Sequence, residues 1–115
     1  MEIKESTESS ILVLAVSGEI DLNHSPALRV ILRDKAKAKT AQLLLDFTAV
    51  AYIDSSGLAT LIEYYQSARS FSGKFALCSL SSRVQSSFDL MRLSEVFSIF
   101  ADQASAQKYF TGTTA

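Results

Sequence analysis

The chain has 115 residues, which suits one compact domain, and its shares of apolar residues (48%) and charged residues (20%) are ordinary for a globular protein. The formal net charge of −1 gives no long-range attraction to polyanions, so we expect no nucleic acid among the partners. A single cysteine excludes an internal disulfide and favours a reducing compartment. With no signal-peptide pattern and no apolar run of about eighteen residues, the sequence predicts a cytoplasmic protein with no direct membrane insertion.

The N-terminal third predicts a hairpin followed by a helix. Residues 2–7 alternate weakly between apolar and polar side chains, and residues 11–20 (ILVLAVSGEI) are dense in branched aliphatic residues, as strands are. Residues 8–10 (ESS) form a plausible turn between them, without the Asn-Gly signature. At Ser25-Pro26 the serine can cap a helix whose first residue is the proline.

The middle of the chain predicts a buried strand and a second helix. Residues 42–47 (QLLLDF) are a nearly continuous apolar run, typical of an interior strand covered on both faces. After the stretch IDSSGL a helical pattern follows and ends near Ser72-Gly73. Its apolar stripe has the i, i+3, i+4, i+7 spacing of an amphipathic helix: Leu58, Leu61, Ile62 and Tyr65.

The last third predicts two more strand–helix pairs. Residues 74–80 (KFALCSL) indicate a strand. The spacing from Ser82 to Gln85 fits a capping box and opens a helix that runs to Met91. Three segments complete the chain: a short strand at residues 96–100, a helix that starts at Asp102, and a frayed tail at residues 112–115.

The predicted order is therefore β-β-α-β-α-β-α-β-α, which favours an α/β fold. Strands that alternate with helices imply a largely parallel sheet, and the opening hairpin must add an antiparallel edge. We expect a mixed sheet of about five strands with about four helices, packed mainly on one face. The single domain spans residues 1–115, with its core at about residues 8–110.

No catalytic, metal-binding or cofactor-binding set is visible. The only histidine, His24, lies in a polar turn, and no G-x-S-x-G elbow accompanies it. One histidine and one cysteine cannot form a typical structural zinc site, and no phosphate-binding glycine loop is present. Cys78 lies in an apolar strand and is interpreted as an inert core residue. The sequence predicts no enzyme, no cofactor and no metal.

Three aspartates come near the ends of predicted strands. Asp21, Asp46 and Asp54 would lie at the edge of an open α/β sheet where ligands and partners gather. Turn and cap roles explain Asp21 equally well and Asp46 better. Since the edge has functional-looking positions but no catalytic set, the chain resembles a protein that is acted upon.

The junction IDSSGL allows two interpretations of its serines. Ser55 or Asp54 can accept the free N–H groups of the first helical turn, so Ser55→Ala should cost about 1 kcal/mol if Ser55 is the cap. Ser56 falls within that turn, where an attached phosphate would meet unpaired N–H groups and the positive end of the helix dipole. Gly57 would leave room for another protein to approach.

The stretch DFTAVAYIDSSGLATL resembles the signature of STAS domains of the anti-sigma factor antagonist family. VSGEIDLNHSPALR resembles the second strand, loop and first helix of that family, and GKFALCSLSSRVQSSFDLMRLSEVFSIF its later elements. The resemblance covers roughly residues 8–110 and implies a single STAS-like domain. Two departures are Ala59, where many members have a second glycine, and His24, where many have a small residue.

The resemblance also implies a function. An antagonist of this kind binds an anti-sigma factor that is itself a serine kinase with a histidine-kinase-like ATPase fold, and so frees a sigma factor. The kinase phosphorylates the antagonist and releases itself, and a metal-dependent serine phosphatase reverses the reaction. The implied phosphoacceptor is Ser56, with Ser55 as the alternative. The implied partner contacts are Asp21, Leu22, Asn23, Asp54, Ser55, Ser56, Gly57 and Leu58. Another role of such domains, as accessory subunits of lipid-transport ATPases, stays open as the alternative.

Overall fold

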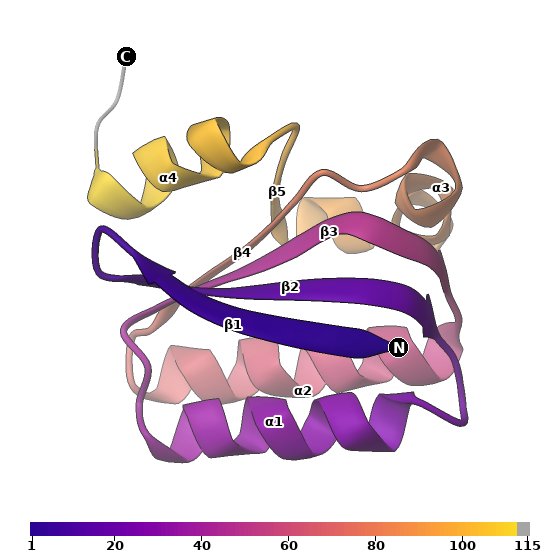
Figure 1. Ribbon diagram of the computed structural model, residues 1–115, viewed down its shortest axis with the longest axis horizontal. Coiled ribbons are helices and arrows are strands. Elements are labelled where there is room, and N and C mark those ends of the chain that lie inside the picture. The colour runs from indigo at the N-terminus through magenta and orange to yellow at the C-terminus, as the bar shows by residue number, and fades with distance from the viewer. Residues whose placement is uncertain (113–115) are drawn as a thin grey trace.

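Strands and helices alternate along residues 1–112, the part of the chain that the computed structural model describes (Figure 1). The strands are β1 (Glu2–Glu8), β2 (Ile11–Ile20), β3 (Gln42–Ile53), β4 (Lys74–Cys78) and β5 (Ser98–Phe100). The helices are α1 (Ser25–Lys37), α2 (Ser55–Ser70), α3 (Ser82–Leu90) and α4 (Gln103–Thr111), with one 3₁₀ turn, η1 (Leu93–Glu95), before β5.

The sheet is mixed, as the sequence predicts. Its strand order is β1-β2-β3-β4-β5, with β1 antiparallel to β2 and every other neighbouring pair parallel. The predicted hairpin turn is made by Ser9 and Ser10, whose φ angles of 50° and 68° are the left-handed values that a two-residue hairpin turn requires. The expected α/β fold class and element order are confirmed.

The central strand β3 has one core on each face because its side chains alternate. Leu43 and Leu45 belong to the larger apolar cluster, to which α1, α2 and α3 also contribute. Leu44 belongs to a smaller cluster that includes Phe110 of α4. Helix α4 therefore covers the face of the sheet opposite to α1 and α2 (Figure 1), whereas the other three helices share the larger cluster, as expected of helices packed mainly on one face.

Two helix starts differ from the predicted ones. His24 occupies the N-cap position of α1 without a side-chain cap bond, and Ser25 is already the first helical residue. At α3 the cap is Ser81, not Ser82: its extended backbone lets its hydroxyl accept a hydrogen bond from the N–H of Val84 at 3.2 Å. In both cases two adjacent polar residues could occupy the N-cap position, and the sequence alone does not distinguish between them.

The C-terminal part follows the predicted order with shifted boundaries. Helix α3 ends before Met91, and β5 starts at Ser98, two residues later than expected, because η1 intervenes. Helix α4 begins after Asp102 as predicted, and the Asp102 carboxylate accepts a hydrogen bond from the N–H of Ser105 at 2.8 Å. Of the tail expected to fray, residues 113–115 lie outside the described residues.

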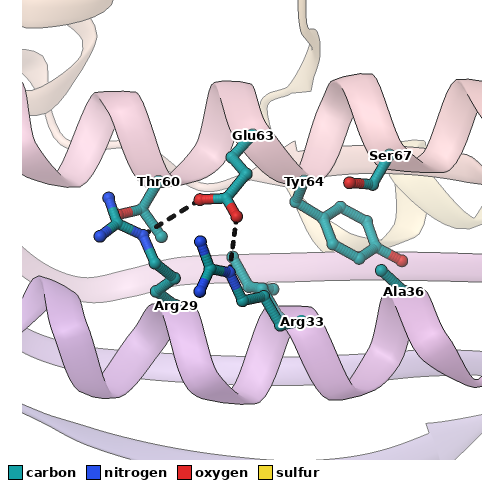
Figure 2. A pocket seen from close by; sticks show the side chains of 8 residues that line it. Arg29, Arg33, Ala36, Thr60, Glu63, Tyr64 and Ser67 are labelled. Atoms are coloured by element: carbon teal, nitrogen blue, oxygen red, sulfur yellow. Dashed lines mark hydrogen bonds and ion pairs between the residues drawn. The ribbon is translucent and has the colours of Figure 1, made fainter.

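Helices α1 and α2 lie side by side on one face of the sheet (Figure 1). Figure 2 shows Arg29 and Arg33 of α1 reaching Glu63 of α2, with Nε–Oε distances of 3.0 and 2.6 Å. The ring of Tyr64 fills the space beside this cluster. Such partly exposed ion pairs contribute little free energy each. They do connect the two helices whose first residues meet at the site described next.

Candidate functional site

Strands β2 and β3 end together, which brings two aspartates to one edge of the sheet. Ile20 pairs with Ile53 in parallel register, so Asp21 and Asp54 are the next residues along neighbouring strands. The backbone N–H of Asp54 donates to the carbonyl of Ile20 at 3.2 Å and closes this end. We call the segments Asp21–Asn23 and Asp54–Leu58 together the edge site.

Asp46 does not join the edge site. Strand β3 continues to Ile53, so Asp46 lies inside the strand rather than near its end. Its carboxylate accepts hydrogen bonds from the backbone N–H and the hydroxyl of Thr48, at 2.9 and 2.6 Å. The sequence expectation that three aspartates share one edge was thus wrong for Asp46, because the apolar run was read as ending at residue 47 instead of continuing.

One carboxylate, that of Asp54, connects the two segments of the edge site. Its Oδ1 accepts hydrogen bonds from the N–H of Ser56 at 2.9 Å and of Gly57 at 3.2 Å, which is the geometry of an N-cap on α2. The same oxygen accepts the hydroxyl of Ser56 at 2.6 Å. The other oxygen, Oδ2, accepts the N–H of Leu22 at 3.1 Å, on the loop after β2.

These bonds stabilise the charged form of Asp54. The Ser56 hydroxyl lowers the pKa of the Asp54 carboxyl most; partial desolvation opposes the shift, and the N–H groups of Gly57, Ser56 and Leu22 add to it. The carboxylate is therefore ionised at neutral pH and places a fixed negative charge beside Ser56. This electrostatic arrangement decides what a phosphate at this position would meet.

Ser55 is not the cap of α2, contrary to one of the two interpretations of the sequence. It is the first helical residue and is exposed, while the cap position and the cap bonds belong to Asp54. A carboxylate one residue earlier reaches the free N–H groups first. The 1 kcal/mol expected from removing a Ser55 cap therefore has no structural basis.

Ser56 is partly buried and is held by several hydrogen bonds. Besides donating to Asp54, its hydroxyl accepts a hydrogen bond from the Ser25 hydroxyl at 3.1 Å. Its carbonyl accepts the hydroxyl of Thr60 at 3.0 Å. Sequence reasoning assigned Ser25 to capping α1 and missed this contact, since no pattern links residues 31 positions apart.

The loop after β2 is organised by Asp21. Its Oδ1 accepts hydrogen bonds from the N–H groups of Asn23 and His24, at 3.0 and 3.1 Å, and contacts Nδ1 of His24 at 2.7 Å. Partial desolvation opposes the shift, but the hydrogen bonds and charge of His24 lower the pKa of Asp21. This is the turn role that the sequence allowed, and the His24 side chain is 41% exposed, as expected of a surface residue.

Gly57 and Leu58 shape the edge site from beneath. A Cβ atom at Gly57 would lie 2.7 Å from Cγ1 of Ile53, 2.8 Å from Cγ2 of Ile20 and 2.9 Å from the Ile20 carbonyl oxygen. Both Gly57 and Leu58 are buried. The glycine is therefore required by close packing of α2 on the ends of β2 and β3.

Exposed apolar side chains lie within the edge site and beside it. Leu22 is 72% exposed in the loop after β2, and Leu90 and Met91 at the end of α3 are 85% and 60% exposed. A groove runs between the start of α2 and the end of α3 and is lined by Tyr52, Ile53, Asp54, Ser55, Leu58, Ser87, Leu90 and Met91. The sequence analysis placed Met91 inside a helix and did not identify this apolar surface. The two adjacent apolar residues Leu90 and Met91 at the helix end were the signal that could have indicated it.

Two other kinds of feature are absent from the described residues 1–112. These residues contain no group of three or more histidine, cysteine, aspartate or glutamate residues that could hold a metal ion. No helix in this range is long and apolar enough to cross a membrane. Cys78 is fully buried, and burial raises the pKa of its thiol to about 11, which agrees with the predicted inert core role.

Comparison with known proteins places the fold. The family model of the STAS domain matches residues 2–106. The chain belongs to the STAS domain family. A curated relative, the anti-sigma-B factor antagonist of Listeria monocytogenes, is 31% identical over 99 residues, which are 86% of each chain.

Solved structures share the fold of this STAS domain. An anti-sigma factor antagonist from Mycobacterium paratuberculosis has a TM-score of 0.88 at 23% identity, covering 96% of this chain and 93% of the other. The anti-sigma factor antagonist SpoIIAA in its unphosphorylated form has a TM-score of 0.84 at 16% identity, covering 99% and 100%. The phosphorylated form of SpoIIAA from Bacillus has a TM-score of 0.72 at 15% identity, covering 94% and 98%.

The site residues predicted from the sequence fall into two groups in this STAS domain. Those on the surface are Leu22, Asn23 and Ser55, with Asp21, Asp54 and Ser56 partly exposed. Gly57 and Leu58 are the buried members. The hydrogen bonds of Asp54 bring the two predicted segments together, since they join residues 32 positions apart in the sequence.

Proposed function

We propose that this STAS domain is a cytoplasmic anti-sigma factor antagonist whose edge site binds an anti-sigma factor and is switched off by phosphorylation of Ser56. The observation that carries the proposal is the position of the Ser56 hydroxyl, 2.6 Å from a carboxylate that also holds the neighbouring loop. The 31% identity to a curated anti-sigma-B factor antagonist over most of both chains supports the class of partner. The partner is a serine kinase, and a metal-dependent serine phosphatase restores the unmodified state.

Charge explains how a phosphate would act as a switch. A phosphoserine carries about −1.5 to −2 charges at pH 7. At Ser56 that charge would stand beside Asp54 and near the loop of Asp21, in a site that contains no lysine or arginine of its own. A partner surface that accepts the unmodified, already acidic site then meets a much larger negative charge. A hundredfold loss of affinity corresponds to about 2.7 kcal/mol, within the range measured for like charges at close interfaces.

The hydrogen bonds favour Ser56 over Ser55 as the acceptor. A phosphate on Ser56 removes the O–H donor that Asp54 accepts and so alters the carboxylate that holds both segments. A phosphate on Ser55 would sit on an exposed residue beside these bonds and leave the cap of α2 intact. Only modification of Ser56 changes the edge site from within.

The exposed apolar residues indicate how the partner binds. Leu22 on one side of Ser56, and Leu90 and Met91 on the other, give apolar area around an acidic centre. Interfaces commonly combine an apolar core with a few buried polar contacts. We expect the anti-sigma factor to cover Leu22 as well as Leu90 and Met91. Leu90→Ala should therefore weaken binding while leaving the Ser56 hydroxyl in place as phosphoacceptor.

The test combines a kinase reaction with a binding assay. The chain is incubated with ATP and a candidate anti-sigma kinase, and its intact mass and phosphorylated residue are determined. Binding to the same kinase is measured for the unmodified and phosphorylated chains. The proposal expects one added phosphate, on Ser56, and at least a hundredfold weaker binding.

Two serine variants serve as controls for this test. Ser56→Ala should abolish the added mass and retain binding, while Ser82→Ala, at the exposed first position of α3, should change neither. A phosphate found only on Ser55, or equal binding of both forms, contradicts the proposal. Co-purification with a membrane transport ATPase in place of a soluble kinase would favour the accessory-subunit role.

A further inference from the structure

The Ser25 side chain is buried, but its hydroxyl does not cap its own helix, α1. It is the first residue of α1 and is 4% exposed, yet α1 has no side-chain cap bond. A buried hydroxyl without a partner costs several kcal/mol in an apolar setting, so its hydrogen bond decides whether the position is tolerable. That bond goes to Ser56 Oγ on α2, at 3.1 Å.

Two buried residues with hydroxyl groups converge on Ser56. Besides Ser25, Thr60 is 1% exposed and donates its hydroxyl to the Ser56 carbonyl at 3.0 Å. The partly buried Ser56 therefore accepts hydrogen bonds from two buried hydroxyls, one on each of α1 and α2. Packing alone does not require this, because alanine or valine would fill either position without a hydroxyl to satisfy.

The contact fixes how the Ser56 hydroxyl is used. A serine hydroxyl has one donor and two acceptor lone pairs. The donor is committed to Asp54 Oδ1 at 2.6 Å, and one lone pair accepts the Ser25 hydroxyl. One lone pair is left, so the oxygen has a single direction available for forming a new bond.

We propose that Ser25 is a positioning residue for phosphorylation of Ser56, holding its oxygen so that the remaining lone pair is the one presented to the phosphoryl donor. The inference rests on the proposed function. In the reaction, this lone pair forms the bond to the γ-phosphorus of ATP, and the bond from that phosphorus to the β–γ bridging oxygen breaks, its electrons leaving with ADP. The hydroxyl proton passes to the Asp54 carboxylate, which already accepts it, and from there to water.

Alignment is the contribution that such a residue can make. Phosphoryl transfer proceeds through a loose transition state in which the bond to the attacking oxygen is only slightly formed. Positioning of the reactants and stabilisation of charge therefore account for most of the catalysis. Ser25 is buried behind Ser56 and cannot touch a docked kinase. Its removal should therefore lower kcat and leave KM for the chain, and its affinity for the kinase, unchanged.

Two substitutions separate positioning from packing. Ser25→Ala removes the hydroxyl and leaves a small void, whereas Ser25→Cys keeps the volume and replaces the hydroxyl by a weak donor. If Ser25 positions Ser56, both variants lower kcat about fivefold, which is roughly 1 kcal/mol of barrier, with KM within twofold. If Ser25 only fills space, Ser25→Cys behaves as the wild type. Ser86→Ala, an exposed serine bonded within its own helix, is the matched control and keeps wild-type kinetics.

A structural readout that needs no kinase accompanies the kinetics. Hα–Hβ scalar couplings of Ser56 measured by NMR should show one χ1 rotamer in the wild type and averaging in both Ser25 variants, with urea titrations confirming that all chains are folded. Unchanged couplings and unchanged kcat in both variants overturn the inference. If the wild type is phosphorylated on Ser56 and Ser25→Ala is phosphorylated equally fast, only the role of Ser25 is contradicted. A wild-type chain that no candidate kinase modifies on Ser56 defeats the proposed function as well.

Discussion

The carboxylate of Asp54 should contribute more to stability than an ordinary helix cap, and Asp54→Ala measures the difference. Removing a side-chain cap costs about 1 kcal/mol, within a range of about 0.5 to 2. Asp54 also accepts the Leu22 N–H and the Ser56 hydroxyl, and each such bond adds roughly 0.5 to 1.5 kcal/mol. We therefore expect Asp54→Ala to lower the free energy of unfolding by about 2 to 4 kcal/mol.

Asp102 provides a matched control within the same chain. It is the cap of α4, it also has an extended backbone, and its carboxylate accepts the N–H of Ser105 without a link to a second segment. Asp102→Ala should cost about 1 kcal/mol. Asp54→Asn should fall between, because its amide oxygen can cap α2 while its NH₂ group cannot accept the Leu22 N–H.

Urea unfolding followed by circular dichroism measures these differences, and its pH dependence tests their cause. The folded-state pKa of Asp54 is lowered, so its stabilising effect is fully present above its unfolded pKa of about 3.9 and is lost as the pH falls through the folded value. The gap between the wild type and Asp54→Ala should thus be large at pH 7 and shrink in acid. Equal losses for Asp54→Ala and Asp102→Ala at pH 7 would refute the claim that Asp54 connects two segments.

Three other changes have expected outcomes in the same assays. Gly57→Ala should cost about 1 to 3 kcal/mol of unfolding free energy by overpacking against Ile20, whose carbonyl cannot move cheaply; a stabilised variant in urea titration would contradict the packing. Ser55→Ala should stay within about 0.5 kcal/mol of the wild type, because Asp54 is the cap; a loss near 1 kcal/mol would restore Ser55 to that role. Ser56→Asp should weaken kinase binding less than phosphorylation does, while Ser56→Ala retains it, as measured by isothermal titration; equal affinities of Ser56→Asp and the phosphorylated chain would contradict this.

The alternation of strand and helix patterns was enough to predict a largely parallel sheet with Asp21 and Asp54 at the end of two strands. That these two strands, β2 and β3, are neighbours is given by the structure, where Ile20 pairs with Ile53. Asp46 was misplaced because the apolar run was interpreted as ending at residue 47, although the strand continues to Ile53.

The contacts that tune the site were not predictable from local patterns. A serine before proline, or in a serine pair, has several capping frames of similar energy, and tertiary packing chooses among them. Ser25 was assigned to its own helix, but the close approach of α1 and α2 gives its hydroxyl a partner on the other helix. The sequence likewise could not show that Ile20 and Ile53 leave no room for a Cβ atom at Gly57, because that packing joins separate strands to α2.

The same hydrogen bonds explain why charge is only part of the proposed switch. Unmodified Ser56 donates to Asp54, and that donor is the main reason for the lowered pKa of the carboxyl. A phosphoserine oxygen can still accept from Ser25 but has no proton for Asp54, so the carboxylate loses a partner and gains a like-charged neighbour at one step. Because Asp54 also holds Leu22, the change reaches the second segment of the edge site. Ser56→Ala removes the donor without adding charge, and Ser56→Asp adds less charge and fewer acceptor oxygens. Comparing these two variants with the phosphorylated chain therefore separates the lost hydrogen bond from the added charge.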